Sequence, residues 1–369
     1  MHINLILIPF VIILGLFFSS NDTPRGRRNY IIVCSAILML VAALRSPEWM
    51  TDTYHIDTLN YKDMFESTFD MGWSEFWQTF YLRYFSGADE NDVGFIALNK
   101  IIGIFTHEFW MFSLIADLIF FVPFGIILYR YCSRVRQIMF AFIFYIALIQ
   151  VFFLGGARQM FSIGFDMMAL LAVIDRRRIR AIILFLVGVS IHFSSLLFAI
   201  PLLAIWFNIK PSLLKNIHVI CFALFPIVLA FPNQMIQFMG NTVGMEKYSD
   251  YGTRAIQGGS ETFIFLIELL SLFCLVAIKR RDLVSSQKIR TFYVMAPLLT
   301  LLAPLIISNG TMIRISLYYH LFLALLVPFA IDCAFGTKNN GVVYVIAIGA
   351  LSALSLAGGG MTYYFFWQI

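Results

Sequence analysis

The stretch FWMFSLIADLIFFVPFGIILY, residues 109–129, decides the fold. It is long enough to cross a bilayer, because an α-helix needs about 20 apolar residues to span the hydrocarbon core. Its one charged side chain is Asp117. Backbone N–H and C=O groups in lipid have to be bonded within the segment itself, so this stretch is predicted to be a transmembrane helix.

Apolar runs of similar length recur along the chain and predict about 12 transmembrane helices. The predicted spans are residues 3–19, 30–44, 109–129, 138–154, 159–174, 181–191, 193–208, 217–232, 262–278, 291–307, 311–331 and 342–357. Of the 369 residues, 60% are hydrophobic and 13% are charged, whereas soluble domains have about 45–50% apolar and about 25% charged residues. We therefore expect an all-α, polytopic integral membrane protein with a single membrane domain, residues 1–369.

The distribution of Lys and Arg predicts the orientation of the chain. Short loops on one side of the predicted membrane carry 18 of the 26 basic residues, with the densest cluster at residues 176–180. By the positive-inside rule this side is cytoplasmic, which places both termini outside. Because membrane topology accounts for these clusters, nucleic-acid binding is not predicted.

The opposite side carries two longer loops, residues 45–108 and residues 233–261. The first loop is rich in acidic and aromatic residues. Its stretch WSEFWQTFYLRYF, residues 73–85, is amphipathic and is typical of a short helix lying in the membrane interface. We therefore expect the functional face to be the outer, non-cytoplasmic one.

Four polar residues, Arg45, Arg158, His192 and Arg314, are predicted at similar depth on that outer side. Ionisable groups within spans are costly and mark candidate functional sites. Arg158 and Arg314 each follow a helix start, where a cation opposes the helix dipole, so a phosphate site explains them better than membrane anchoring does. Snorkelling at a helix end remains an alternative for Arg45, as a structural hydrogen bond does for His192.

Three acidic residues, Asp117, Asp166 and Glu268, are predicted deeper in the spans. They are candidates for ion-pair partners, proton-relay groups or residues of a substrate path. No HExxH, CxxH or DxD pattern accompanies them. Neither a metal site nor another cofactor is therefore predicted.

Short motifs follow one another along nearly the whole chain. They are Arg45 after the second span; Asp52, or Asp57 with Tyr61; Asp92 in Asp92-Val93-Gly94-Phe95; Arg158 with Gln159; His192 with Ser194 and Ser195; and Arg314 with Tyr318 and Tyr319. In this order they resemble the pattern of the EpsG family, multi-span proteins of bacterial exopolysaccharide and capsule clusters that are regarded as Wzy-type repeat-unit polymerases. The spacing favours Asp57 as the match to the aspartate of the family pattern, and the local Thr-Asp pair favours Asp52. Both assignments therefore remain candidates.

The resemblance implies a metal-independent membrane glycosyltransferase on the outer face of the bacterial plasma membrane. Its substrate would be an oligosaccharide on undecaprenyl diphosphate, and its partners would include the bilayer, a flippase and a chain-length regulator. His192, Arg158 and Arg314 would be catalytic, and the other motif residues would bind substrate. Ser194 and Ser195 are expected to set the His192 tautomer, bond sugar hydroxyls or cap a helix.

The chemistry of these residue types suits that reaction. A guanidinium pairs with phosphate oxygens in a bidentate fashion and stays charged, so Arg158 and Arg314 are expected to share the diphosphate. An imidazole accepts a proton near neutral pH, so His192 is expected to act as the base for the acceptor hydroxyl.

Two other classes of protein were weighed against this interpretation. A transporter or flippase of lipid-linked sugars would also have many spans and buried charges, but the sequence lacks corresponding broken helices in two halves. A membrane O-acyltransferase would use a histidine such as His192, but a cytoplasmic acyl-donor site is not indicated.

Overall fold

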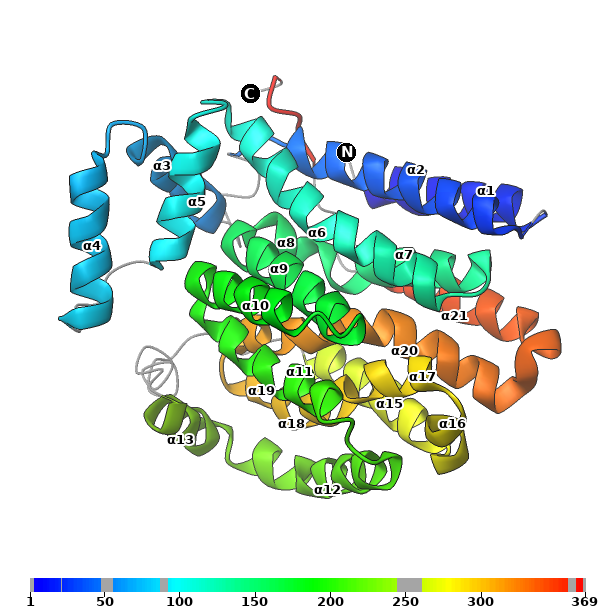
Figure 1. Ribbon diagram of the computed structural model, residues 1–369. Helices are drawn as coiled ribbons and strands as arrows, with labels where there is room; N and C mark the ends of the chain where they lie inside the picture. The colour runs from blue at the N-terminus through cyan, green and yellow to red at the C-terminus, as the bar shows by residue number, and fades with distance from the viewer. Residues whose placement is uncertain are drawn as a thin grey trace. The chain divides into compact units, whose positions relative to one another are not determined.

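The computed structural model describes residues 3–20, 22–47, 56–86, 92–243, 261–357 and 363–367. Throughout these ranges the regular elements are helices (Figure 1), so the all-α prediction is confirmed. The one isolated β-bridge in the described ranges joins Arg45 to Phe365. The chain divides into two compact units: the first comprises residues 1–202 and 348–369, and the second comprises residues 203–347.

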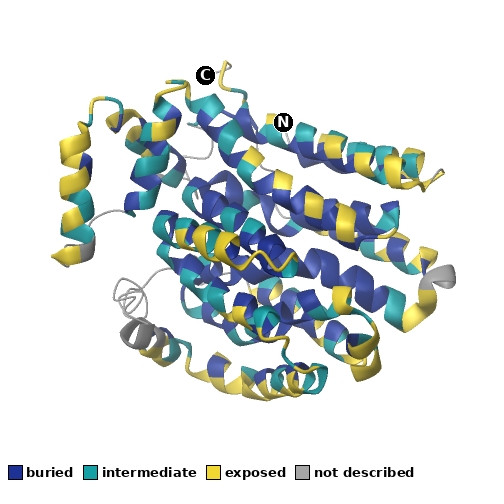
Figure 2. Ribbon diagram, in the orientation of Figure 1, coloured by how far each residue is buried: buried dark blue, intermediate teal, exposed yellow. Residues whose placement is uncertain are grey.

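Helices α1 to α10 build the first unit. Their bounds are α1 Asn4–Ser19, α2 Pro24–Ala43, α3 Ile56–Ser67, α4 Trp73–Phe85, α5 Val93–Gly103, α6 Phe109–Tyr131, α7 Val135–Leu148, α8 Gln150–Leu154, α9 Ala157–Ile174 and α10 Arg178–Ile191, followed by the 3-10 helix η1, Phe193–Phe198. Helix α9 is central, packs against α6 and α10, and is largely buried (Figure 2). A Cβ atom on Gly164 of α9 would lie 2.5 Å from the Ile119 carbonyl oxygen, so this glycine permits the close approach of α9 to α6.

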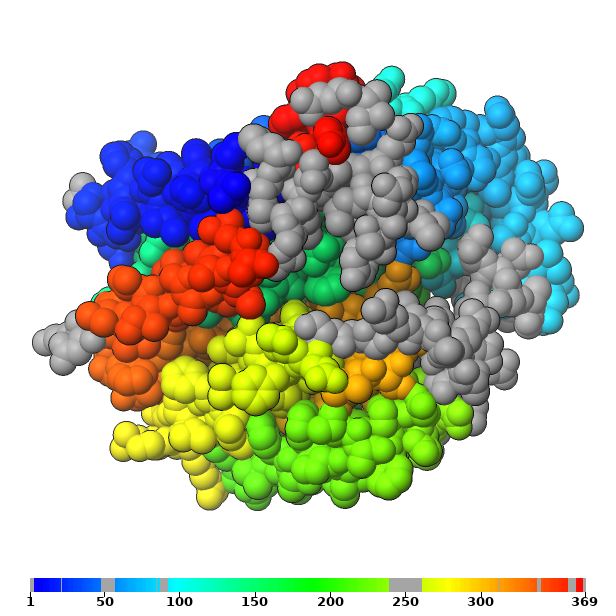
Figure 3. All heavy atoms as spheres, turned by 180° about the vertical axis from the view of Figure 1, so that it is seen from behind, coloured from blue at the N-terminus to red at the C-terminus, as the bar shows by residue number. Residues whose placement is uncertain are grey.

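The second unit is built mainly from α12 to α20. The bounds of its elements are α12 Pro211–Ala230, α13 Pro232–Val243, α15 Glu261–Ala277, α16 Arg280–Ser285, α17 Gln287–Tyr293, α18 Met295–Leu302, α19 Leu305–Ser308, η3 Gly310–Met312 and α20 Ile313–Asn339, while α11 Ala199–Trp206 and α21 Gly341–Ala357 cross the boundary between the units. Helices α15 and α18 pack against α20. Figure 3 shows the side chains of α12 and α15 in contact along one face of this unit.

Six helical segments in the described ranges are long and apolar enough to cross a membrane. They are Pro24–Ala43, Phe109–Tyr131, Ala157–Ile174, Pro211–Ala230, Gln287–Ser308 and Ile313–Gly336. The other predicted spans coincide with shorter helices, and the predicted span at 138–154 is divided at Ile149, where the backbone leaves the helical region between α7 and α8. The multi-span character is confirmed, and the count of about 12 spans stays a prediction.

The two predicted outer loops contain helices of their own. Residues 45–108 include α3, α4 and α5, and residues 233–261 include most of α13. Their place in the membrane interface and on the outer side stays a prediction. Asp52 and residues 244–260 lie outside the described residues.

Candidate functional site

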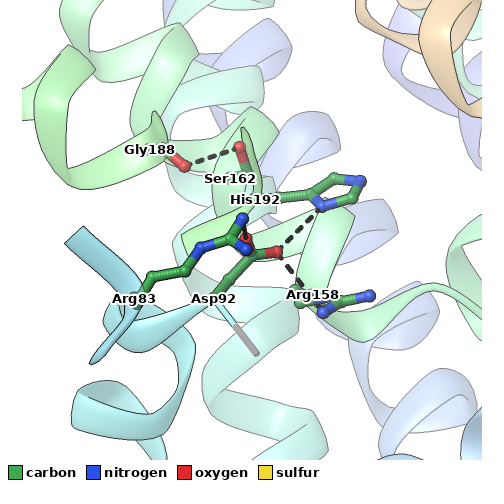
Figure 4. A network of polar contacts seen from close by, with 6 residues as sticks. All are labelled: Arg83, Asp92, Arg158, Ser162, Gly188 and His192. Carbon is green, nitrogen blue, oxygen red and sulfur yellow. Dashed lines mark hydrogen bonds and ion pairs between the residues drawn. The ribbon is translucent and has the colours of Figure 1, made fainter. Parts of the chain in front are cut away.

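The carboxylate of Asp92 lies among three basic side chains (Figure 4). Its Oδ2 atom is 3.3 Å from Nη1 of Arg158 and 3.4 Å from Nδ1 of His192. Its Oδ1 atom is 3.9 Å from Nη2 of Arg83. The four side chains come from four different helix ends, and they keep between 11% and 25% of their surface exposed. We call these four residues the Asp92 cluster.

Three residues of the Asp92-Val93-Gly94-Phe95 motif contribute to placing that carboxylate. Asp92 is the N-cap residue of α5, and its carbonyl accepts a 2.9 Å hydrogen bond from the Phe95 amide. A Cβ on Gly94 would lie 2.5 Å from the backbone carbonyl carbon of Ser190, so only glycine lets α5 approach α10 there. Phe95 is fully buried and anchors α5 in the core of the unit. The motif therefore holds Asp92 beside the end of α10, where His192 lies.

His192 lies between α10 and η1, at the junction that the sequence predicts. Its amide donates to the Gly188 carbonyl at 3.0 Å, and its carbonyl accepts from the Ser195 amide at 2.9 Å. These bonds fix the backbone on both sides of the imidazole. A proton on Nδ1, donated toward Asp92, makes Nε2 the basic nitrogen of the ring.

Arg158 lies in the first turn of α9, as predicted, after the N-cap residue Gly156. Its guanidinium and the His192 imidazole approach the same oxygen of Asp92. Arg158 and His192 therefore lie close together, and an acidic residue joins them. Gln159, which follows it, is 4% exposed and buried within the unit.

Ser194 and Ser195 lie in the interior below His192. Both are 0% exposed, and Ser195 Oγ donates to the Asp166 carboxylate, whose oxygens lie at 2.7 and 2.8 Å. Asp166 is itself fully buried in α9. The hydroxyl of Ser195 thus ties η1 to α9. The expected roles of Ser194 and Ser195 at the His192 tautomer or at sugar hydroxyls stay predictions.

Arg45 is buried, and its donors are directed at backbone carbonyls. Nη1 donates to Ala42 at 2.5 Å and Nη2 donates to the Leu154 carbonyl. Leu154 directly precedes the glycines that lead to Arg158, so Arg45 holds the segment that carries Arg158. The acidic side chain that lines a small pocket with Arg45 is Asp117.

The strand-like segment that contains Arg45 is covered by the C-terminal end of the described chain. The Ser46 amide donates to the Tyr364 carbonyl at 2.9 Å, and the Phe366 amide donates to the Leu44 carbonyl at 3.0 Å. Of the two candidates for the family aspartate, Asp57 lies in the first turn of α3, and Asp52 lies outside the described residues.

The remaining predicted residues lie outside the Asp92 cluster. Tyr61 is 7% exposed and packs edge-on against Phe95 in the core of the first unit. Arg314 opens α20 in the second unit, and Tyr318 and Tyr319 are buried in the same helix. The predicted sharing of a diphosphate between Arg158 and Arg314 stays a prediction.

One neighbour of the site residues, Arg83 of the cluster, was missed by the sequence analysis. Asp117, which lines a pocket with Arg45, was among the predicted candidates. Arg83 is the one basic residue of the stretch WSEFWQTFYLRYF, which is the signal that could have singled it out. Within the described residues no group of three or more His, Cys, Asp and Glu side chains could hold a metal ion.

Comparison with known proteins gives one match. The model of the EpsG family matches residues 30–357, which include every motif quoted above. No curated protein and no solved structure matches the chain.

Proposed function

The chain belongs to the EpsG family, and from this membership together with the Asp92 cluster we propose the reaction that it catalyses. The family indicates a membrane polysaccharide polymerase. The proposed substrate is an oligosaccharide repeat unit on undecaprenyl diphosphate, and the proposed place of reaction is the outer face of the bacterial plasma membrane. The product would be an exopolysaccharide or capsule.

The contact between Asp92 and the His192 imidazole carries this proposal. A carboxylate at Nδ1 fixes the ring orientation and stabilises the imidazolium that forms when Nε2 takes a proton. In the proposed step, the acceptor hydroxyl attacks the anomeric carbon of the donor and loses its proton to Nε2. The bond from that carbon to the diphosphate oxygen breaks, and the diphosphate leaves with the electron pair.

Arg158 is the proposed partner of the leaving diphosphate. A diphosphate needs no general acid, but the charge that develops on it needs preorganised donors. The Arg158 side chain is 22% exposed, and before substrate arrives its charge is met by Asp92 at 3.3 Å. A guanidinium can keep that contact through one nitrogen and donate to phosphate oxygens through another, because its five N–H groups form a rigid fork.

Arg314 is the proposed second donor to the diphosphate. It begins a long apolar helix, as Arg158 does, and both positions place an arginine beside the free amides of a helix N-terminus. The two residues belong to different units.

The test is polymer formation by purified protein supplied with extracted lipid-linked repeat units. Wild-type protein should give a ladder of products, and His192→Ala and His192→Gln should both abolish it, because a glutamine cannot act as a base. His107→Ala is the matched control, since this exposed histidine stacks on Phe69 outside the cluster and its loss should leave the ladder intact. A normal ladder from His192→Gln would overturn the assignment of the base.

A further inference from the structure

A surface groove runs between α2 and α6, away from the Asp92 cluster. Its volume is about 420 Å³, within the range of about 300–1,000 Å³ that small-molecule sites occupy. The groove is lined by Arg28, Ile31, Ile32, Ser35, Ala36 and Met39 of α2 and by Phe121, Val122, Gly125, Ile126, Tyr129 and Arg130 of α6. Nearly all of this lining is apolar.

The two helices are antiparallel, so their basic residues meet at one end of the groove. A Cβ on Gly125 would touch Ile31 at 3.0 Å, and the Arg27 guanidinium lies 6.0 Å from the centre of the Tyr129 ring. In both pairs the two residue numbers add up to the same value. This is expected of two helices that run in opposite directions. Arg28, in the first turns of α2, and Arg130, in the last turn of α6, therefore lie at the same end.

That end of the groove carries an excess of positive charge. Arg28 is exposed and forms no ion pair within the described residues. Arg130 pairs with Asp175 at 2.8 Å but keeps 43% of its side chain exposed. Arg27 is directed at the Cys132 carbonyl, at 2.6 Å, and adds a third cation. Asp175 and Asp22, which accepts from the Val135 amide at 3.3 Å, are the carboxylates near this end. Three guanidiniums thus face two carboxylates, and an anionic ligand would complete the balance.

The other end of the groove lies along the membrane-spanning parts of both helices. Ile32 and Val122 are 57% and 52% exposed, and both helices are long and apolar enough to cross a membrane. At this depth an apolar groove excludes water and is filled by hydrocarbon. The small residues Ser35, Ala36 and Gly125 give it its depth.

We propose that this groove is a binding site for one anionic glycerophospholipid, with an acyl chain along the apolar walls and the phosphate at Arg28 and Arg130. A basic pocket between spanning helices is the arrangement that selects anionic headgroups. The excess positive charge at the end of the groove favours a ligand with a net negative charge. An apolar helix of a partner protein has none, and the phosphate of a zwitterionic lipid is balanced by that lipid's own cation. The site is separate from the proposed polymerase reaction and does not depend on it.

The test uses the full chain in vesicles of equal parts phosphatidylglycerol and phosphatidylcholine, followed by mass spectrometry of the lipid–protein complexes. Wild-type protein should retain phosphatidylglycerol over phosphatidylcholine by about 30-fold, since Arg28 and Arg130 each contribute about 1 kcal/mol toward an anionic lipid. Arg28→Gln should lower that preference about fivefold. Arg177→Gln, which removes an exposed arginine that does not line the groove, should leave it unchanged.

A second variant tests the groove itself. Ala36→Phe fills the space between the helices without altering any charge, and it should reduce the retention of both lipids. The proposal is overturned if wild-type protein retains the two lipids equally, or if Ala36→Phe leaves retention unchanged. It is also overturned if polyprenyl phosphate displaces phosphatidylglycerol at equal concentration, or if Ala36→Phe converts a dimer into a monomer.

Discussion

Two histidines, His192 in the first unit and His218 in the second, show how differently the same side chain can be used. His218 is 0% exposed, and both of its ring nitrogens contact hydroxyl groups, Nδ1 with Tyr293 at 2.8 Å and Nε2 with Ser271 at 3.0 Å. His192 lies at a helix end, contacts a carboxylate and keeps 11% of its side chain exposed. The first arrangement satisfies a buried imidazole, and the second prepares one for proton transfer.

The surroundings of the two histidines differ in charge as well as in access. The His218 network continues through Ser271 to Thr300 at 2.6 Å, and all of these hydroxyl groups are neutral and fully buried. The Asp92 cluster holds one carboxylate among three basic groups at the ends of four helices. A saturated neutral network stabilises packing, whereas a charged cluster with open edges can exchange partners with a substrate. The predictions below test this contrast.

The largest effect is expected at Arg158. Arg158→Lys should lower kcat/KM for lipid-linked repeat units by about 2–4 kcal/mol, roughly 30-fold to 1,000-fold, because a point charge cannot replace a bidentate fork on the diphosphate. Steady-state kinetics on purified protein measure this. Arg177→Lys, at an exposed position outside the cluster, is the control and should leave kcat/KM unchanged.

A double variant tests whether Arg158 and Arg314 act on one group. If both bind the same diphosphate, the losses of Arg158→Ala and Arg314→Ala should be clearly non-additive. Simple addition of the two free-energy losses would mean that the arginines act independently.

The next effect is expected at Asp92. Asp92→Asn keeps the size of the side chain but removes the charge that stabilises the imidazolium, so kcat should fall about 100-fold with little change in KM. Asp166→Asn is the comparison, because Asp166 contacts Ser195 below His192 and an asparagine can still accept that hydrogen bond. Equal losses of kcat from the two variants would contradict a direct role for Asp92.

The helix-end positions of Arg158 and His192 were accessible to sequence reasoning because polar residues at the rim of apolar runs are conspicuous. The contact of both residues with Asp92 could not be predicted from the sequence. It depends on the close packing of Gly94 against Ser190, two residues that are 96 positions apart. The predicted substrate binding of Arg45 stays a prediction, and two of its donors point at backbone carbonyls. Hydropathy carries no information about which acceptors a buried arginine finds.

The helical fold was predictable from run length and hydropathy, but these two properties do not predict where a helix is broken. Run length and hydropathy identify apolar segments, and these segments are helical throughout the described ranges. Run length and hydropathy do not reveal a local break such as the one at Ile149. They also do not reveal that the span predicted at 291–307 is divided into α17, α18 and α19. Such breaks depend on backbone geometry at single residues, which Pro304 at the start of α19 illustrates.

At His218 we expect a loss of stability without a loss of chemistry. His218→Phe removes the buried contact of the Tyr293 hydroxyl, which costs about 1–3 kcal/mol for a group left unsatisfied, whereas Ser271 keeps its contact with Thr300. Thermal unfolding in detergent should show a lower Tm, while polymer formed per folded molecule should stay within about twofold of wild type. Lost activity at an unchanged Tm would give His218 a role in the reaction and end the contrast with His192.

The smallest effect is expected at Arg83, the outermost member of the Asp92 cluster. Its Nη2 atom is 3.9 Å from Asp92 and its side chain is 25% exposed, so solvent screens the pair and its contribution should be below about 1 kcal/mol. Arg83→Gln should therefore change kcat/KM no more than about fivefold, mainly through KM if α4 helps to hold the acceptor. Lys62→Gln is the control, because it removes a comparable exposed ion pair, with Glu66, on the neighbouring helix α3. A loss of kcat as large as that of Arg158→Lys would instead place Arg83 on the diphosphate and extend the phosphate site to α4.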